Sequence, residues 1–286
     1  MSETTRRRIA ADLKGLSLGP LSWSWDARRA ILYALGVGAR PDRDLDFLYE
    51  ARGPKVLPTY GVIPAMLLLE QLLERVQAPL QGLLHGEQAL LLHRPFPPAG
   101  LASVAGRVSE VWDKGKAAVI AVEARLADAA GPLCDTKGTF FVRGAGGFGG
   151  PRGPATETAE PAPPQRPADF VAEEDTRPEQ AALYRLSGGA SPLHIDPEFA
   201  AQAGYPQPTL HGLATYGFVG RALLAALCGG DPARLVALAG RFSDVVYPGE
   251  KLIIRIWLTG PGNAVLQAET QDGRIVFARG AARFRT

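Results

Sequence analysis

Cysteine is scarce in this chain of 286 residues, which holds only Cys134 and Cys228. The two lie far apart, and neither has a second Cys or a His at metal-ligand spacing, which argues against a disulfide framework and against a metal site. No apolar run approaches the roughly 20 residues that a membrane-spanning helix needs. The basic residues at 6–8 are not followed by the apolar stretch of a secretory signal. These absences predict a cytoplasmic protein with no membrane partner.

Strong charge of one sign is also missing. The formal net charge is +2, with 21% charged and 46% hydrophobic residues, as in ordinary globular proteins. This balance gives no reason to expect nucleic acid as a partner. No glycine-rich dinucleotide fingerprint follows a strand pattern, so a nicotinamide or flavin cofactor is not indicated. We expect that the protein uses no cofactor.

Glycine and proline, by contrast, are abundant and are concentrated in one segment. Half of the residues from 144 to 167 are Gly or Pro, a composition that cannot sustain a helix or a central strand. We therefore predict an N-terminal domain over 1–143, a linker over 144–167 and a C-terminal domain over 168–286. The "GGFGG" of 146–150 could instead form an ordered loop whose bare backbone approaches a ligand.

The two sides of this linker resemble each other. Residues 58–76 and 208–227 both start with turn chemistry and become apolar helices, which we expect to begin near Gly61 and Gly212. Runs rich in Val, Ile and Phe, separated by Gly, Asp and Pro turns, follow each helix, and we expect one such strand at 241–250. This pattern predicts an α+β fold in which two antiparallel sheets each wrap a central helix and join edge to edge.

The stretch 184–217, "YRLSGGASPLHIDPEFAAQAGYPQPTLHGLATYG", holds two of the four histidines. Asp196 is placed to cap a short helix that ends near Gly204, so His194 lies on a loop that this helix positions. His211 and Gly212 come at the start of the second apolar helix, where free backbone N–H groups can stabilise a negative oxygen. The spacing predicts a site around His194.

These residues carry a resemblance to a known family. "YRLSG", "SPLHIDP" and "LHGLATYG" are similar to the hydratase motif of the MaoC-like, (R)-specific type-2 enoyl-CoA hydratases, and further segments resemble that family in the same order. The resemblance implies a double hot-dog fold and an acyl-CoA thioester as substrate. It also implies a non-catalytic N-terminal half that accommodates the acyl chain and CoA, a catalytic C-terminal half, and a homodimer.

In that family an Asp and a His, five residues apart, activate water for syn addition to a trans-2-enoyl thioester, and a backbone N–H polarises the thioester carbonyl. By resemblance, His194 is the histidine and Gly212 supplies the N–H. Gly189 stands at the position of the Asp, and Ser191 at that of an Asn. The remaining implied contacts to substrate come from His211, Gly146, Gly147, Phe148 and Gly149.

The missing carboxylate leaves three interpretations open. In the first, the protein is an active hydratase in which His194 works alone, or in which Asp244, or less plausibly Asp231, replaces the acid. In the second, it is a thioester enzyme with modified chemistry, such as dehydration or isomerisation of a specialised acyl chain. In the third, it binds acyl-CoA without turnover. Positioned acid–base groups contribute about 100- to 10,000-fold in rate, so the loss matters.

Overall fold

A computed structural model describes residues 13–76, 82–154 and 162–286. Its N-terminal half contains five strands and two longer helices, connected by short helical segments. In chain order the elements are β1 (Ser17–Trp25), α2 (Ala27–Gly36), α3 (Leu45–Leu48), η1 (Glu50–Arg52), η2 (Pro58–Val62), α4 (Ile63–Val76), β2 (Leu83–Leu92), β3 (Gly100–Asp113), β4 (Ala117–Asp128) and β5 (Gly131–Arg143).

The C-terminal half repeats this plan with five strands and one long helix. Its elements are β6 (Phe170–Asp175), α5 (Gln180–Tyr184), η4 (Arg185–Ser187), η5 (Pro192–His194), α6 (Pro197–Gln202), α7 (Gly212–Cys228), η6 (Pro232–Arg234), β7 (Leu235–Phe242), β8 (Lys251–Gly260), β9 (Asn263–Thr270) and β10 (Ile275–Phe284). The predicted helix from Gly212 is confirmed, whereas the first helix opens with the 3₁₀ turn η2 and becomes α-helical at Ile63.

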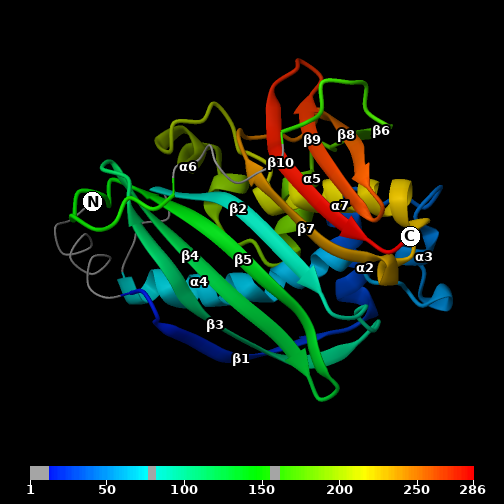
Figure 1. The fold of residues 1–286 in the computed structure, drawn as a ribbon, viewed down its shortest axis with the longest axis horizontal. Helices are drawn as coiled ribbons and strands as arrows, with labels where there is room; N and C mark the ends of the chain where they lie inside the picture. The colour runs from blue at the N-terminus through cyan, green and yellow to red at the C-terminus, as the bar shows by residue number, and fades with distance from the viewer. Residues whose placement is uncertain (1–12, 77–81, 155–161) are drawn as a thin grey trace.

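All ten strands form one antiparallel sheet in the order β1-β3-β4-β5-β2-β7-β10-β9-β8-β6. The two halves meet where residues 87–91 of β2 pair with residues 237–241 of β7. Figure 1 shows α4 along one face of the N-terminal strands and α7 against the C-terminal strands. The predicted α+β arrangement, with each half wrapping a helix and the halves joined edge to edge, is confirmed.

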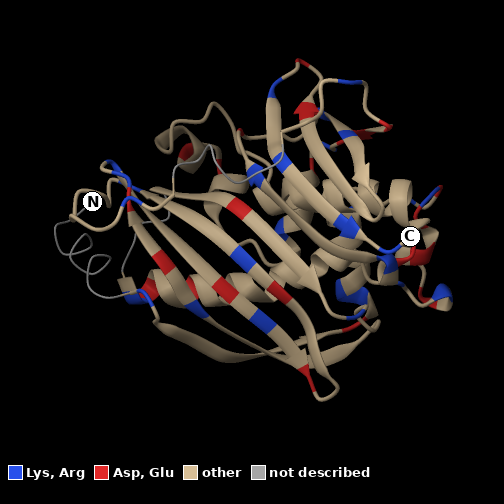
Figure 2. Cartoon of the chain, in the orientation of Figure 1, with Lys and Arg blue, Asp and Glu red and all other residues tan. Residues whose placement is uncertain are grey.

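Along β3, β4 and β5, exposed charged residues alternate with buried residues. Figure 2 shows the positions of these charged residues on the ribbon. Glu123 pairs with Arg107 and Lys137, and Arg125 forms a two-pronged ion pair with Asp135. This period-two pattern turns the apolar side chains of the same strands toward α4.

The long helix α7 also holds the two halves together. A Cβ atom on Gly217 would lie 2.2 Å from Val37, and one on Gly220 would lie 2.4 Å from Thr59, so these glycines let the helix approach the N-terminal half closely. On the same helix, the buried Arg221 donates to Asp44 at 3.0 Å and also pairs with Glu174 of β6. Helix α7 is therefore fixed to both halves by close packing and by a buried ion network.

The structure corrects the strand expected at 241–250 and adds two strands that were not predicted. The strand expected at 241–250 ends at Phe242, because the chain turns away through a Pro-Gly segment and only β7 pairs in the sheet. Tyr184, the first residue of the motif stretch, is the last residue of α5. The edge strands β1 and β6 were not predicted, since each precedes the long helix of its half, whereas the recognised repeat consists of a helix followed by strands.

Candidate active site

The loop that carries the motif is built from short helical turns between α5 and α6. Gly188 has a φ of 146°, a conformation that L side chains rarely adopt, and a Cβ there would lie 2.8 Å from Ile63 of α4. The following helix is capped as predicted, because the Asp196 carboxylate accepts the N–H groups of Glu198 and Phe199. The motif loop is thereby held between a rigid helix and the N-terminal half of the protein.

His194 is partly buried and fixed by the segment that leads into α7. Its Nδ1 lies 2.9 Å from the carbonyl oxygen of Thr209, which can only accept, so Nδ1 carries the proton. The lone pair of a neutral His194 therefore sits on Nε2, which accepts no hydrogen bond from the described residues. Burial lowers the pKa of His194 from 6.5 to about 4, because imidazolium loses its hydration there. At neutral pH this side chain is an unprotonated base.

His211 stacks on His194, with ring centroids 3.6 Å apart and planes 29° apart. Its Nε2 donates to the carbonyl oxygen of Gly189 at 3.3 Å, and its Nδ1 is buried without a partner among the described residues. The ring is only 6% exposed and also contacts Tyr184. Burial first, and then the charge of His194, hold the pKa of His211 well below its usual range. The site is thus an imidazole pair with no carboxylate attached.

Gly189 and Ser191 lie on the same loop as His194. Gly189 donates its N–H to Arg185, and its carbonyl accepts from His211. Ser191 directly precedes the turn η5 without a side-chain capping bond, and its carbonyl accepts the N–H of His194 at 3.4 Å. The structure brings together four predicted residues, namely Gly189, Ser191, His194 and His211.

Gly212 follows directly as the first residue of α7. The first amides of an α-helix have no partner within the helix, and the Gly212 N–H donates to no described residue. Helix N-termini carry a partial positive charge. Gly212 is three residues from Thr209, the residue that anchors His194, so a free donor and a neutral base lie on adjoining segments.

A cavity of about 420 Å³ opens beside this loop and is lined by both halves of the protein. Trp23, Tyr60 and Ile63 come from the N-terminal half, and the motif loop from 185 to 190 closes the other side. A larger hollow of about 1120 Å³ lies over the middle of the sheet, but none of the predicted site residues lines it. The smaller cavity has Gly189 in its lining, whereas His194 and His211 lie behind the loop and do not line it.

The glycine-rich loop is ordered but lies elsewhere. Asp113, at the end of β3, accepts the N–H groups of Gly115, Gly147 and Gly149 at 2.8 Å each. These bonds lower the pKa of Asp113 to about 2. Among the described residues, no hydrogen bond or ring contact joins Gly146, Gly147, Phe148 or Gly149 to either histidine. Residues 155–161 of the predicted linker lie outside the described residues.

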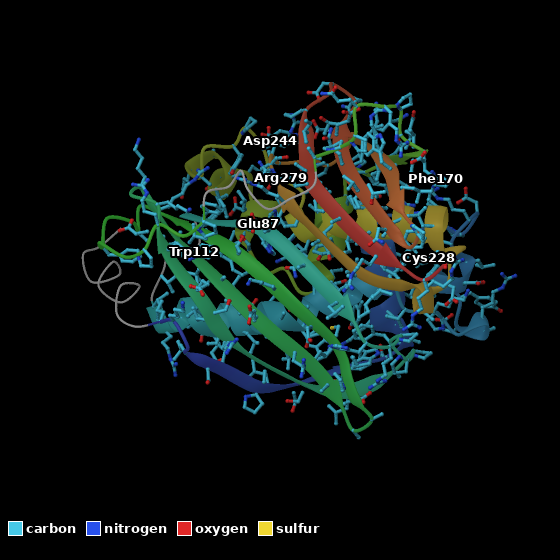
Figure 3. The ribbon with its side chains drawn as sticks, viewed as in Figure 1. Glu87, Trp112, Phe170, Cys228, Asp244 and Arg279 are labelled. Carbon is cyan, nitrogen blue, oxygen red and sulfur yellow. The ribbon has the colours of Figure 1, made fainter. Side chains whose placement is uncertain are left out.

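Neither acid suggested as a substitute for the missing Asp reaches the site. Asp244 lies on the exposed loop after β7 and accepts the N–H of Val245 (Figure 3). Asp231 is exposed and caps the short helix η6. In the part of the chain that the structure describes, no hydrogen bond or ion pair joins either carboxylate to His194 or His211. Both acids serve turns, as exposed Asp residues often do.

Sequence reasoning missed the residue that sets the state of His194. Thr209 was not singled out, because a threonine that acts through its backbone carbonyl leaves no mark in the sequence. Its N–H also donates to the carbonyl of Leu193, which ties the two segments together beside the base. A structure was needed to find this contact.

Comparison with known proteins supports the resemblance. Residues 23–144 match the family model of the MFE-2 hydratase 2 N-terminal domain, and residues 159–276 match that of the MaoC-like domain. The chain is 43% identical to 3-hydroxyacyl-thioester dehydratase Y of Mycobacterium tuberculosis, over 93% of this chain and 94% of the relative. The chain belongs to the MaoC-like hydratase 2 family.

Further members of this family show the same extent of similarity. Enoyl-CoA hydratase 2, peroxisomal, of Arabidopsis thaliana is 39% identical and aligns over 83% of each chain. The crystal structure of a MaoC-like dehydratase from Phytophthora capsici superposes with a TM-score of 0.85 at 31% identity, covering 96% of each chain. A M. tuberculosis structure described as a double hot-dog fold superposes with a TM-score of 0.63. The predicted double hot-dog fold is confirmed.

No group of three or more His, Cys, Asp or Glu side chains among the described residues is placed to hold a metal ion. No helix among those residues is both long and apolar enough to cross a bilayer.

Proposed function

We propose that this protein catalyses the reversible addition of water to trans-2-enoyl-CoA thioesters, which gives (3R)-hydroxyacyl-CoA. The observation that carries the proposal is a neutral His194 with a free Nε2 lone pair, anchored to Thr209 three residues before the unpartnered N–H of Gly212. Membership of the hydratase 2 family supports the substrate class and the direction of addition.

The chemistry needs only groups that the chain supplies. As the water oxygen bonds to the β-carbon, one water O–H bond breaks and its proton moves to Nε2 of His194. The electrons of the double bond shift onto the thioester oxygen, where the Gly212 N–H stabilises the negative charge. The imidazolium then returns one proton to the α-carbon, which restores the neutral base. Dehydration runs through the same steps in reverse.

The N-terminal half takes part in this proposal through the cavity between the halves. Its apolar wall, including Trp23, Tyr60 and Ile63, suits an acyl chain that enters next to Gly189. The division into a catalytic C-terminal and an accommodating N-terminal half is part of the proposal. Substrate contacts from Gly146, Gly147, Phe148 and Gly149 stay a prediction from the resemblance, since Asp113 already occupies two of these amides.

The test is hydration of a medium-chain trans-2-enoyl-CoA, followed by the loss of absorbance of the enoyl thioester. We expect the protein to turn over and His194→Ala to lose at least about 100-fold in kcat, the usual contribution of a positioned base. His93→Ala is the matched control, because His93 pairs with Asp135 on the far part of β5 and should leave kcat unchanged. Equal rates for the protein and His194→Ala would refute the proposal.

A second candidate function is binding of acyl-CoA without turnover. The observation in its favour is Gly189, where no carboxylate helps His194 to hold water. This alternative predicts that enoyl-CoA binds with no loss of absorbance, and that His194→Ala changes neither result.

We also propose the cytoplasm as the compartment. Cys134 and Cys228 are buried free thiols, which suits a reducing environment. A homodimer stays a prediction from the family resemblance.

A further inference from the structure

The space next to Gly189 is already occupied. A Cβ atom built on Gly189 would lie 2.5 Å from Nε2 and 2.6 Å from Cδ2 of His211, closer than real Cβ atoms come. Gly189 does not have a positive φ, so its backbone would accept a side chain. The His211 ring, and not the backbone, occupies the space that a side chain at position 189 would need.

His211 is held in that space from three sides. It donates to the Gly189 carbonyl, stacks face to face on His194 and touches the Tyr184 ring. His211 is itself only 6% exposed, and its ring covers one face of the His194 ring. The positive charge of Arg185, in η4, also lowers the pKa of His211.

We propose that His211 is the positioning residue of this site, taking the room in which a carboxylate at position 189 would otherwise orient the base. The base is then a neutral pair of stacked imidazoles that accepts at most one proton, since two adjoining imidazolium ions would repel each other. His211 restrains the ring of His194 and keeps it desolvated, whereas a carboxylate would stabilise its charged form. Only the changes in kcat expected from this inference rest on the proposed hydratase function.

The first test reads the pKa of His194 without any turnover, from the NMR titration of its ring protons between pH 5 and 8. In the unchanged protein we expect no titration in this range, because the pKa of His194 is about 4. His211→Ala opens the covered face, so the pKa of His194 should rise by at least one unit. His211→Phe keeps a stacked ring and should leave His194 untitrated. If His211→Ala leaves the titration unchanged while lowering only the melting temperature, His211 is a packing residue and the inference is overturned.

The second test is a double-mutant cycle with Gly189→Asp, which measures whether the two side chains compete for one space. In the unchanged background Gly189→Asp should not raise kcat, because it collides with the His211 ring. In the His211→Ala background, whose kcat should be at least tenfold below that of the unchanged protein, the same substitution should raise kcat at least tenfold. A rise of similar size in both backgrounds would show that the ring does not occupy the place of the acid.

These outcomes separate the two proposals. If neither the unchanged protein nor the His93→Ala control turns over enoyl-CoA, the proposed function fails. The NMR titrations of His194 still decide the role of His211. If the protein turns over and His211→Ala matches it in kcat and in the His194 titration, only the inference about His211 fails.

Discussion

Lowering the pH from 8 to 5 should leave this site active while it destabilises the fold. With a pKa of about 4, His194 stays neutral in about 90% of molecules at pH 5. An ordinary histidine of pKa 6.5 would be neutral in only about 3% at that pH. We therefore expect kcat for hydration to be nearly flat from pH 8 to 5.

The same depressed pKa has the opposite effect on stability. Burial also lowers the pKa of His85 from 6.5 to about 4, beside Phe140 and Phe242. Below pH 6.5 these histidines bind protons in the unfolded chain but not in the folded protein. The free energy of unfolding therefore falls as the pH falls toward 4. By linkage each histidine costs about 2 kcal/mol of unfolding free energy at pH 5. Together, His85 and His194 remove about 4 kcal/mol between pH 8 and 5.

Two measurements check this reasoning. Initial hydration rates at saturating enoyl-CoA give the pH profile, and urea unfolding midpoints at pH 8 and pH 5 give the stability change. His85→Phe is the informative variant, because it should keep the flat rate profile and remove the contribution of His85, about 2 kcal/mol, from the pH-dependent destabilisation. A rate that halves near pH 6.5 would show that His194 is solvated and would refute the argument from burial. A free energy of unfolding that is the same at pH 8 and pH 5 would also refute the argument from burial.

Two further predictions concern the framework of the site. Asp113→Asn should loosen the loop at 146–149, lower the free energy of unfolding by about 1–3 kcal/mol and speed its proteolysis, since it removes the charged acceptor of three backbone amides. Arg221→Ala should cost about 2–3 kcal/mol in urea unfolding, because it leaves the buried carboxylates of Asp44 and Glu174 with only the partly exposed Arg43 as a cationic partner. Replacing the exposed Arg107, which pairs with Glu123 on the solvent face, should cost less than about 1 kcal/mol and is the control for the second.

Much of the architecture was predictable because it depends on local chemistry. The capped helix after His194 follows from Asp196 and Pro197, and the helix from Gly212 follows from an unbroken apolar run. Runs rich in Val, Ile and Phe between Gly, Asp and Pro turns predicted the central strands of both halves. The quoted motif segments were enough to indicate the family, and they showed at once that position 189 holds no acid.

Tertiary structure decided what replaces that acid. Residues 189, 194 and 211 are separated in the chain, and only folding stacks the two imidazoles and places the His211 ring where a side chain on Gly189 would lie. The hydrogen bonds from the glycine-rich loop to Asp113 could not be predicted either, because the backbone amides that reach a carboxylate depend on the folded geometry. The edge strands β1 and β6 were not predicted because each precedes the long helix of its half and so lies outside the repeated pattern of a helix followed by strands. The sequence by itself determined the fold and the location of the site. The protonation state of its base was decided by burial and by the Thr209 carbonyl, which exist only once both halves have folded together.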